Sequence, residues 1–177
     1  TRNLANLAVT VAGIARGEAS QAAIGGILSD TQGRILERFA SPIGRATEEV
    51  AEYKALLEAL KRALPHQPGE IVVFLENRTV ANQILGNLSP REPSLQNLNR
   101  QVQEVLRQFP RWRVSFVDQE VCRPARRLAE QALFAETKAE REKAILRQEI
   151  VSLVEALPVE ALRRALSFLQ SLQATKG

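Results

Sequence analysis

The stretch EIVVFLE, residues 70–76, constrains the fold of this chain more than any other segment. It is a continuous apolar run of strand length with a charged residue at each end. Such a run is typical of a strand that is buried on both faces at the centre of a sheet. We therefore expect an α/β protein whose mixed sheet is flanked by helices.

The segment before this strand has the pattern of three further strands. Residues 4–14 and 23–28 are rich in small and β-branched apolar side chains, and residues 35–44 follow with an extended pattern. The turn residues of SDTQGR, at 29–34, separate the last two segments. The first forty residues therefore predict a three-stranded antiparallel meander.

Helical spacing begins at Thr47, a good N-cap residue that Glu48 and Glu49 follow in the first turn. The apolar series then repeats at helical intervals until PHQPG, at 65–69, ends the helix. The further elements expected are a short helix ending at Gly86, a helix over 94–109, a strand over 112–119 and a helix that begins after Pro124. Together with the opening strands they predict a five-stranded domain over residues 1–135.

The sequence changes character at residue 136 and becomes a run of charged, amphipathic helix. Two apolar stripes are separated by Pro158, which predicts a helical hairpin over residues 136–177. The stripes could pack on one another and on their own domain, or they could serve self-association or the docking of a partner.

Composition excludes several classes of chemistry. Cys122 and His66 are the single cysteine and the single histidine, so neither a disulfide, a zinc cluster nor Cys/His catalysis is expected, and no cofactor is implied. No apolar run approaches the roughly 20 residues that span a bilayer. The opening residues lack the pattern of a signal peptide, so we expect a cytoplasmic protein.

The net charge of +4 is unevenly distributed. Seven arginines lie between residues 100 and 127, against three acidic residues in the same segment. Such a cluster could meet phosphates or an acidic protein surface, or it could be a solvated face.

Four local patterns recur in the order that a known family would give them. They are VAGIARGEASQAAIGGIL with its glycines at 13, 17, 25 and 26, the run from Thr47 to Tyr53 that contains Ala-Glu-Tyr, Glu76-Asn77 with Gln83, and Cys122 followed by RRLA. Over residues 4–135 the sequence thereby resembles the ribonuclease HI family. The resemblance implies a ribonuclease H-like fold and a place in nucleic-acid processing.

Members of that family hydrolyse phosphodiesters with two Mg²⁺ ions held by four carboxylates. The resemblance places Ala12, Glu52, Glu76 and Arg126 at the four carboxylate positions. Ala12 has no oxygen to offer, and Arg126 puts a permanent cation where divalent cations would sit. We therefore expect a non-catalytic protein without a bound metal, in which Arg126 pairs with Glu52 or Glu76.

Three functions remain open at this stage. The first is a protein-binding adaptor or inhibitor in RNA metabolism, for example of a nuclease, with a homo-oligomer through the C-terminal hairpin as a further possibility. The second is binding of RNA or an RNA/DNA hybrid, although Glu48 and Glu49 would repel phosphates. The third is a residual nuclease that uses Glu52 and Glu76 with Glu18 or Asp118. The arginines expected at a partner or nucleic-acid surface are Arg16, Arg113, Arg123, Arg126 and Arg127.

Overall fold

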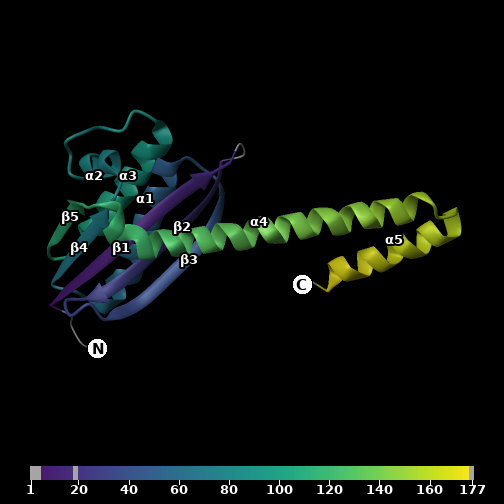
Figure 1. Ribbon diagram of the computed structural model, residues 1–177, viewed down its shortest axis with the longest axis horizontal. Coiled ribbons are helices and arrows are strands. Elements are labelled where there is room, and N and C mark those ends of the chain that lie inside the picture. The colour runs from purple at the N-terminus through teal and green to yellow at the C-terminus, as the bar shows by residue number, and fades with distance from the viewer. Residues whose placement is uncertain (1–4, 18–19, 176–177) are drawn as a thin grey trace. The chain divides into compact units, whose positions relative to one another are not determined.

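A computed structural model describes residues 5–17 and 20–175. In this part of the chain five strands form one sheet in the order β3-β2-β1-β4-β5 (Figure 1). The strands are β1 (Asn6–Arg16), β2 (Gln21–Asp30), β3 (Ile35–Arg45), β4 (Glu70–Leu75) and β5 (Trp112–Phe116). The predicted α/β class and five-stranded mixed sheet are confirmed.

The first three strands form the predicted meander. β1 pairs antiparallel with β2, and β2 pairs antiparallel with β3. The turn between β2 and β3 is closed by the Asp30 carboxylate, which accepts hydrogen bonds from the backbone N–H groups of Gln32 and Arg34, each at 2.9 Å. Gly33 provides the positive φ of 78° that the turn needs.

Three helices and a short 3₁₀ turn lie on one face of the sheet. They are α1 (Glu48–Ala63), the turn η1 (Leu64–His66), α2 (Arg78–Ile84) and α3 (Pro93–Leu106). Alternate side chains of a strand point to opposite faces, and Leu7, Val9 and Val11 of β1 are fully buried in the main core with α1. The predicted N-cap is confirmed, because the Thr47 hydroxyl accepts a hydrogen bond from the Val50 N–H at 3.2 Å.

Helix α4 spans Gln119–Glu155, and its first part, residues 119–135, crosses in front of the sheet in Figure 1 and packs against the other face. A second apolar cluster joins Ile14 and Ala23 of the sheet to Ala129 and Leu133 of this helix. Gly25 permits the contact, since a Cβ there would lie 2.3 Å from the Ala125 carbonyl oxygen.

Burial of β4 on both faces, expected from the apolar run, holds fully on one face only. Ile71, Val73 and Leu75 are completely buried, whereas Val72 and Phe74 on the opposite face are half-buried. β4 lies parallel to both β1 and β5, with Val9 opposite Val73. The residues that share the face of Val9 therefore make up the main core.

Two expectations about the later elements are wrong. The helix predicted after Pro124 begins at Gln119 instead, so Pro124 lies inside it and removes one backbone hydrogen bond. The turn that precedes this proline is held because Cys122 is fully buried. The strand predicted over 112–119 ends at Phe116, and the helix runs without interruption through residue 135.

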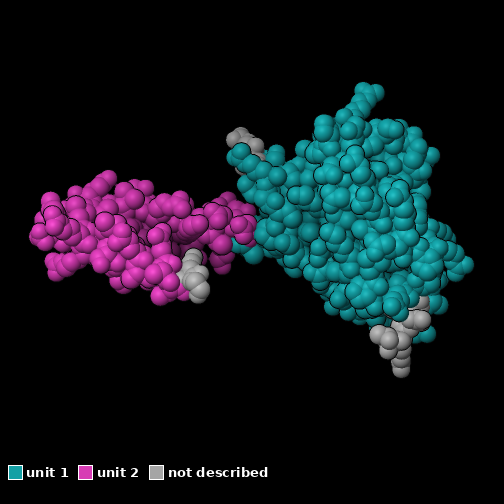
Figure 2. Space-filling view, turned by 180° about the vertical axis from the view of Figure 1, so that it is seen from behind, with its two compact units in different colours: residues 1–135 teal, residues 136–177 magenta. Residues whose placement is uncertain are grey.

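The chain divides into two compact units, residues 1–135 and 136–177, which Figure 2 colours separately. The second unit contains the end of α4 and helix α5 (Val159–Ala174), with Pro158 as the N-cap residue of α5. Within the described residues, no helix is long and apolar enough to cross a membrane.

Candidate active site

The candidate site is organised by a close approach between β1 and α1. A Cβ atom on Gly13 would lie 2.2 Å from the backbone nitrogen of Glu52, so the strand and the helix can meet at this distance only at a glycine. The Gly13 N–H then donates a hydrogen bond of 2.9 Å to Oε2 of Glu52. This contact holds the Glu52 carboxylate against β1. The residue is buried there, with only 2% of its surface exposed.

Burial changes the ionisation of Glu52. Desolvation raises the pKa of Glu52 to about 7, because removing a carboxylate from water disfavours its charged form. The hydrogen bond from Gly13 and the charge of Arg126 lower this pKa, while the nearby Glu48 raises it. Glu52 therefore changes its protonation state near neutral pH.

Arg126 occupies the site as an ion-pair partner of Glu76. An η nitrogen of Arg126, which extends from α4, donates to Oε1 of Glu76, the residue that follows the last residue of β4. The Glu76 side chain is 9% exposed and that of Arg126 is 28% exposed. Of the two pairings that the sequence left open, the structure contains the one with Glu76, while the charge of Arg126 also acts on Glu52.

A cavity of about 360 Å³ opens at these groups. Seven residues line it: Gly13, Glu48, Glu52, Glu76, Asn77, Gln119 and Arg126. The sequence patterns identified Glu52, Glu76 and Arg126 as one site, and the structure brings them together. Ala12 is not among the lining residues, since it is fully buried within the sheet.

Four lining residues were not predicted as site residues, and two of them, Gly13 and Asn77, directly follow the predicted Ala12 and Glu76. Glu48 stands four residues before Glu52, so the helical period alone could have placed both carboxylates on one side of α1. Gln119 carried no such signal, because its segment was expected to be strand and proves to be the start of α4.

The donor set does not fit two Mg²⁺ ions. Oε1 of Glu52 and Oε2 of Glu76 are buried without a hydrogen-bond partner in the described part of the chain, so each residue retains one free oxygen. A guanidinium, however, lies where a further carboxylate would be needed, and Ala12 contributes only a methyl group. Two like charges a few Å apart repel by roughly 4 kcal/mol at an effective dielectric constant near 20. Within the described residues, no three acidic, histidine or cysteine side chains are grouped as metal ligands.

Most of the arginines expected at a binding surface are paired with carboxylates. Arg16 contacts Glu130 at 2.5 Å, Arg113 contacts Glu70 at 3.1 Å, and Arg123 pairs with Glu120 one helical turn away. Among these candidates, the exposed Arg127 has no ion pair that the described residues show.

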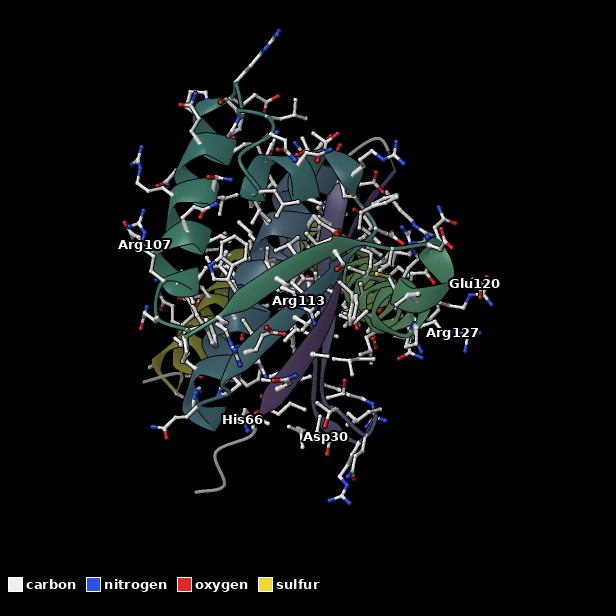
Figure 3. All side chains as sticks on the ribbon, turned by 90° about the vertical axis from the view of Figure 1, so that its left-hand side faces the viewer. Asp30, His66, Arg107, Arg113, Glu120 and Arg127 are labelled. Atoms are coloured by element: carbon white, nitrogen blue, oxygen red, sulfur yellow. The ribbon has the colours of Figure 1, made fainter. Side chains whose placement is uncertain are left out.

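These arginines also do not form one surface. Figure 3 shows Arg113 on β5, apart from Arg127 and Glu120 on α4. The partner of Arg113, Glu70, begins β4, whereas Glu76 follows its end, so the two glutamates lie about 20 Å apart along the strand. Arg113 therefore does not belong to the cavity.

Other residues of the four patterns have structural roles. The Tyr53 hydroxyl donates to Oε1 of Gln83 at 2.7 Å and accepts from Nδ2 of Asn99 at 3.1 Å, which joins α1, α2 and α3. The Asn77 side chain caps α2 by accepting from the Val80 N–H at 3.0 Å. Burial raises the pKa of the Cys122 thiol to about 12, so this thiol stays protonated.

The remaining candidates do not complete a catalytic group. His66 lies 3.8 Å from Glu37 and does not line the cavity. Asp118 is exposed and is also absent from the lining. Glu18, the other acid considered for a residual nuclease, lies outside the described residues.

Comparison with known proteins agrees with the fold. The family model for reverse transcriptase-like proteins matches residues 10–132. Ribonuclease HI of Halobacterium salinarum is 31% identical over 121 residues, which are 68% of this chain and 61% of that protein. The bifunctional protein Rv2228c of Mycobacterium tuberculosis is 31% identical over 124 residues, or 70% of this chain and 34% of that protein. The chain thus matches less than two thirds of the length of either relative.

Solved structures give the same result. The crystal structure of RNase H1 from Halobacterium salinarum superposes with a TM-score of 0.70 at 29% identity, covering 73% of this chain and 98% of that one. The N-terminal RNase H domain of Rv2228c, solved as a fusion with maltose binding protein, gives 0.73 at 28% identity, covering 77% and 99%. The resemblance to ribonuclease HI is confirmed, and the chain belongs to the reverse transcriptase-like family, with a ribonuclease H-like domain.

Proposed function

We propose that this protein is a non-catalytic ribonuclease H-like protein that binds a protein partner in RNA metabolism, as an adaptor or an inhibitor, for example of a nuclease. The observation that carries the proposal is the ion pair between Arg126 and Glu76. It places a permanent cation beside the carboxylates that would have to hold two Mg²⁺ ions. The place in RNA metabolism rests on the relatives, whose names describe ribonucleases.

Two features favour a protein partner over a nucleic acid at this site. The cavity is lined by Glu48, Glu52 and Glu76 against Arg126 alone, a balance that repels phosphates. Arg16, Arg113 and Arg123 are each engaged by a carboxylate, so their charge is largely neutralised.

The absence of catalysis can be tested directly. We expect the full chain to leave a labelled RNA·DNA hybrid intact with either Mg²⁺ or Mn²⁺. Its rate of hydrolysis should not exceed that of a Glu52→Gln control. Hydrolysis that the Glu52→Gln variant abolishes would refute the proposal.

A gain of metal binding supplies the complementary test. The double variant Ala12→Asp/Arg126→Asp returns two carboxylates to the site and removes the cation. We expect Mg²⁺ to raise the melting temperature of this variant and to leave that of the parent unchanged, because only a chain with a metal site gains free energy from the ion. An equal rise in the parent would show that the parent's own donor set holds Mg²⁺.

The partner class is tested by affinity capture from the native cell, with and without nuclease treatment. Proteins retained after nuclease treatment and at high salt support the proposal. Proteins that nuclease treatment releases were bridged by nucleic acid and would contradict it.

A second candidate function is binding of RNA or an RNA/DNA hybrid at a different surface. Arg100, Arg107 and Arg111, on α3 and the loop after it, are exposed and have no ion pair within the described part of the chain. Binding there should weaken steeply with salt and should be lost in Arg107→Glu/Arg111→Glu. The variant Arg113→Glu is the matched control, since its parent side chain is already paired with Glu70. A gel shift without a complex at low salt would dispose of this candidate.

A further inference from the structure

The second compact unit has no buried residue between positions 136 and 175. Large apolar side chains that are 37–69% exposed follow both of its helices. They are Ile145, Leu146, Ile150, Val151, Leu153, Leu157, Val159, Leu162, Leu166, Phe168, Leu169 and Leu172. Exposed apolar surface of this extent on a soluble protein normally marks an interaction site.

The two helices of this unit cannot cover these side chains by themselves. The best-covered residues of these stripes are only half-buried, and they are Val154, Ala161 and Ala165. Two of the three are alanines, so the shared surface is small. Helices whose apolar stripe is wider than a single neighbour can cover are typical of a four-helix bundle, where each helix packs on two others.

One side of α4 combines apolar and acidic residues. Glu142, Leu146, Glu149 and Leu153 are spaced by four, three and four residues, so they follow one line along the helix. Glu142 and Leu146 also line a shallow groove of about 470 Å³. Lys143 and Arg147 line the same groove. The acidic edge formed by Glu142 and Glu149 therefore borders the leucines on one side only.

One side of α5 combines apolar and basic residues. Arg164 stands four residues before Phe168, one helical turn away, and both are exposed. Arg163 and Arg164 are the two charged residues in the middle of this helix. Neither Glu149 nor Arg164 takes part in an ion pair that the described residues show.

We propose that a second copy of this chain covers the unit, with α4 of one copy against α5 of the other. A two-fold axis makes such a contact twice, so the acidic edge of each α4 meets the basic edge of the partner's α5 in both halves of the interface. A contact of α4 with α4 along the line of Glu142 and Glu149 would place glutamates beside glutamates and is disfavoured. The product is a four-helix bundle whose apolar stripes are enclosed.

The charge balance of the unit also argues for this occupant. Residues 136–177 contain six acidic and seven basic side chains, so the unit has almost no net charge to attract a polyanion. A nearly neutral, apolar surface with a local alternation of charge is instead suited to its own copy.

The first test measures the mass of the full chain in solution by sedimentation velocity over a range of concentrations. We expect a dimer for the parent and a monomer for Leu153→Glu/Phe168→Glu, with a dissociation constant raised more than roughly hundredfold, because each copy would bury two new carboxylates. The matched control is Ala144→Glu/Gln170→Glu, which adds the same charges to other sides of the same helices and should remain dimeric. Circular dichroism checks that the helix content of the variants is unchanged.

A reciprocal charge exchange tests the identity of the occupant. Glu149→Arg and Arg164→Glu should each weaken the dimer, by roughly tenfold, since each creates two like-charge contacts. Mixing these two variants should restore dimers that contain one copy of each, because both contacts then join opposite charges.

A parent that stays monomeric at every concentration would overturn the proposal. So would a dimer that survives in Leu153→Glu/Phe168→Glu, or a mixture of the exchanged variants that associates no better than either variant alone.

Discussion

At the scale of single residues, a hydrogen bond from the backbone holds the Glu52 carboxylate in place, and this contact needs no bound metal. Its Oε2 accepts from the Gly13 N–H, and its other oxygen is buried without a partner. A carboxylate in this position destabilises the fold whenever it is ionised. Removing its charge should therefore stabilise the protein, in contrast to the usual effect of mutating a buried residue.

The variant Glu52→Gln should be more stable than the parent at alkaline pH. The pKa of Glu52 rises from 4.5 to about 7 on folding. The stability that the folded protein gains by binding this proton is fully present below pH 4.5 and is lost as the pH rises through about 7. The loss amounts to about 3 kcal/mol in the parent. Urea denaturation at about pH 5 and about pH 8 measures it, and we expect the two proteins to differ only at the higher pH. Parallel pH profiles would contradict this account.

The variant Arg126→Ala should destabilise the protein. Glu76 would lose its ion-pair partner, and the pKa of Glu52 would rise further because Arg126 lowers it. For a partly exposed pair we expect a loss of about 2 kcal/mol near pH 8. The control is Arg127→Ala, an exposed neighbour, with a change below about 0.5 kcal/mol. Equal denaturation midpoints for Arg126→Ala and the parent would show that the pair has no structural role.

At the scale of elements, local signals predicted the fold wherever they were strong. Thr47 marked the start of α1, the apolar run marked β4, and the turn residues before Ile35 marked the meander. The start of α4 was missed because Pro124 was assigned to a first turn, whereas burial of Cys122 holds one more turn before it. A tertiary contact of this kind has no local signature.

The site, like the fold, could be predicted from the sequence only where local patterns define it. Its central residues, and the pairing of Arg126 with one of its two glutamates, followed from matched patterns, but the pairing of the other arginines did not. Arg113 meets Glu70 across 43 positions of the chain, and Arg16 meets Glu130 across 114, so both pairs depend on the assembled sheet and α4. The pair between Arg123 and Glu120 is the exception, because a separation of three residues on a helix is visible in the sequence.

The contact between β1 and α1 should be intolerant of a single methyl group. In Gly13→Ala the new Cβ would overlap the backbone of Ala51 and Glu52, so α1 would have to move away from the sheet. We expect a loss of about 3 kcal/mol, measured by chemical denaturation. Gly33→Ala is the control, with a loss of about 1 kcal/mol from its positive φ alone, since nothing lies within 4 Å of the added Cβ. A similar loss in both variants would mean that α1 adjusts freely.

At the scale of the whole molecule, the two units differ in how they are stabilised. Residues 1–135 contain the buried core, whereas the described residues from 136 onward have none. Helices without a buried face have little to protect their backbone hydrogen bonds from solvent. The second unit should therefore owe its stability to association.

Hydrogen exchange should reveal this difference. Over a roughly hundredfold range of protein concentration, amides between residues 140 and 172 should become more protected as dimers form, while those of the sheet should not change. Mass spectrometry of peptides from each unit measures both at once. Protection of α5 that is independent of concentration would indicate that the unit is stable within one chain.

The ion pair between Arg126 and Glu76 also makes a metal site hard to gain by single substitutions. Replacing Arg126 by an acid alone would set it beside Glu76 without a counter-charge, and replacing Ala12 by aspartate alone would bury one more carboxylate in a completely buried position. Each of these single substitutions is therefore expected to give a less stable protein, so a further carboxylate could be added to this site only by both changes together.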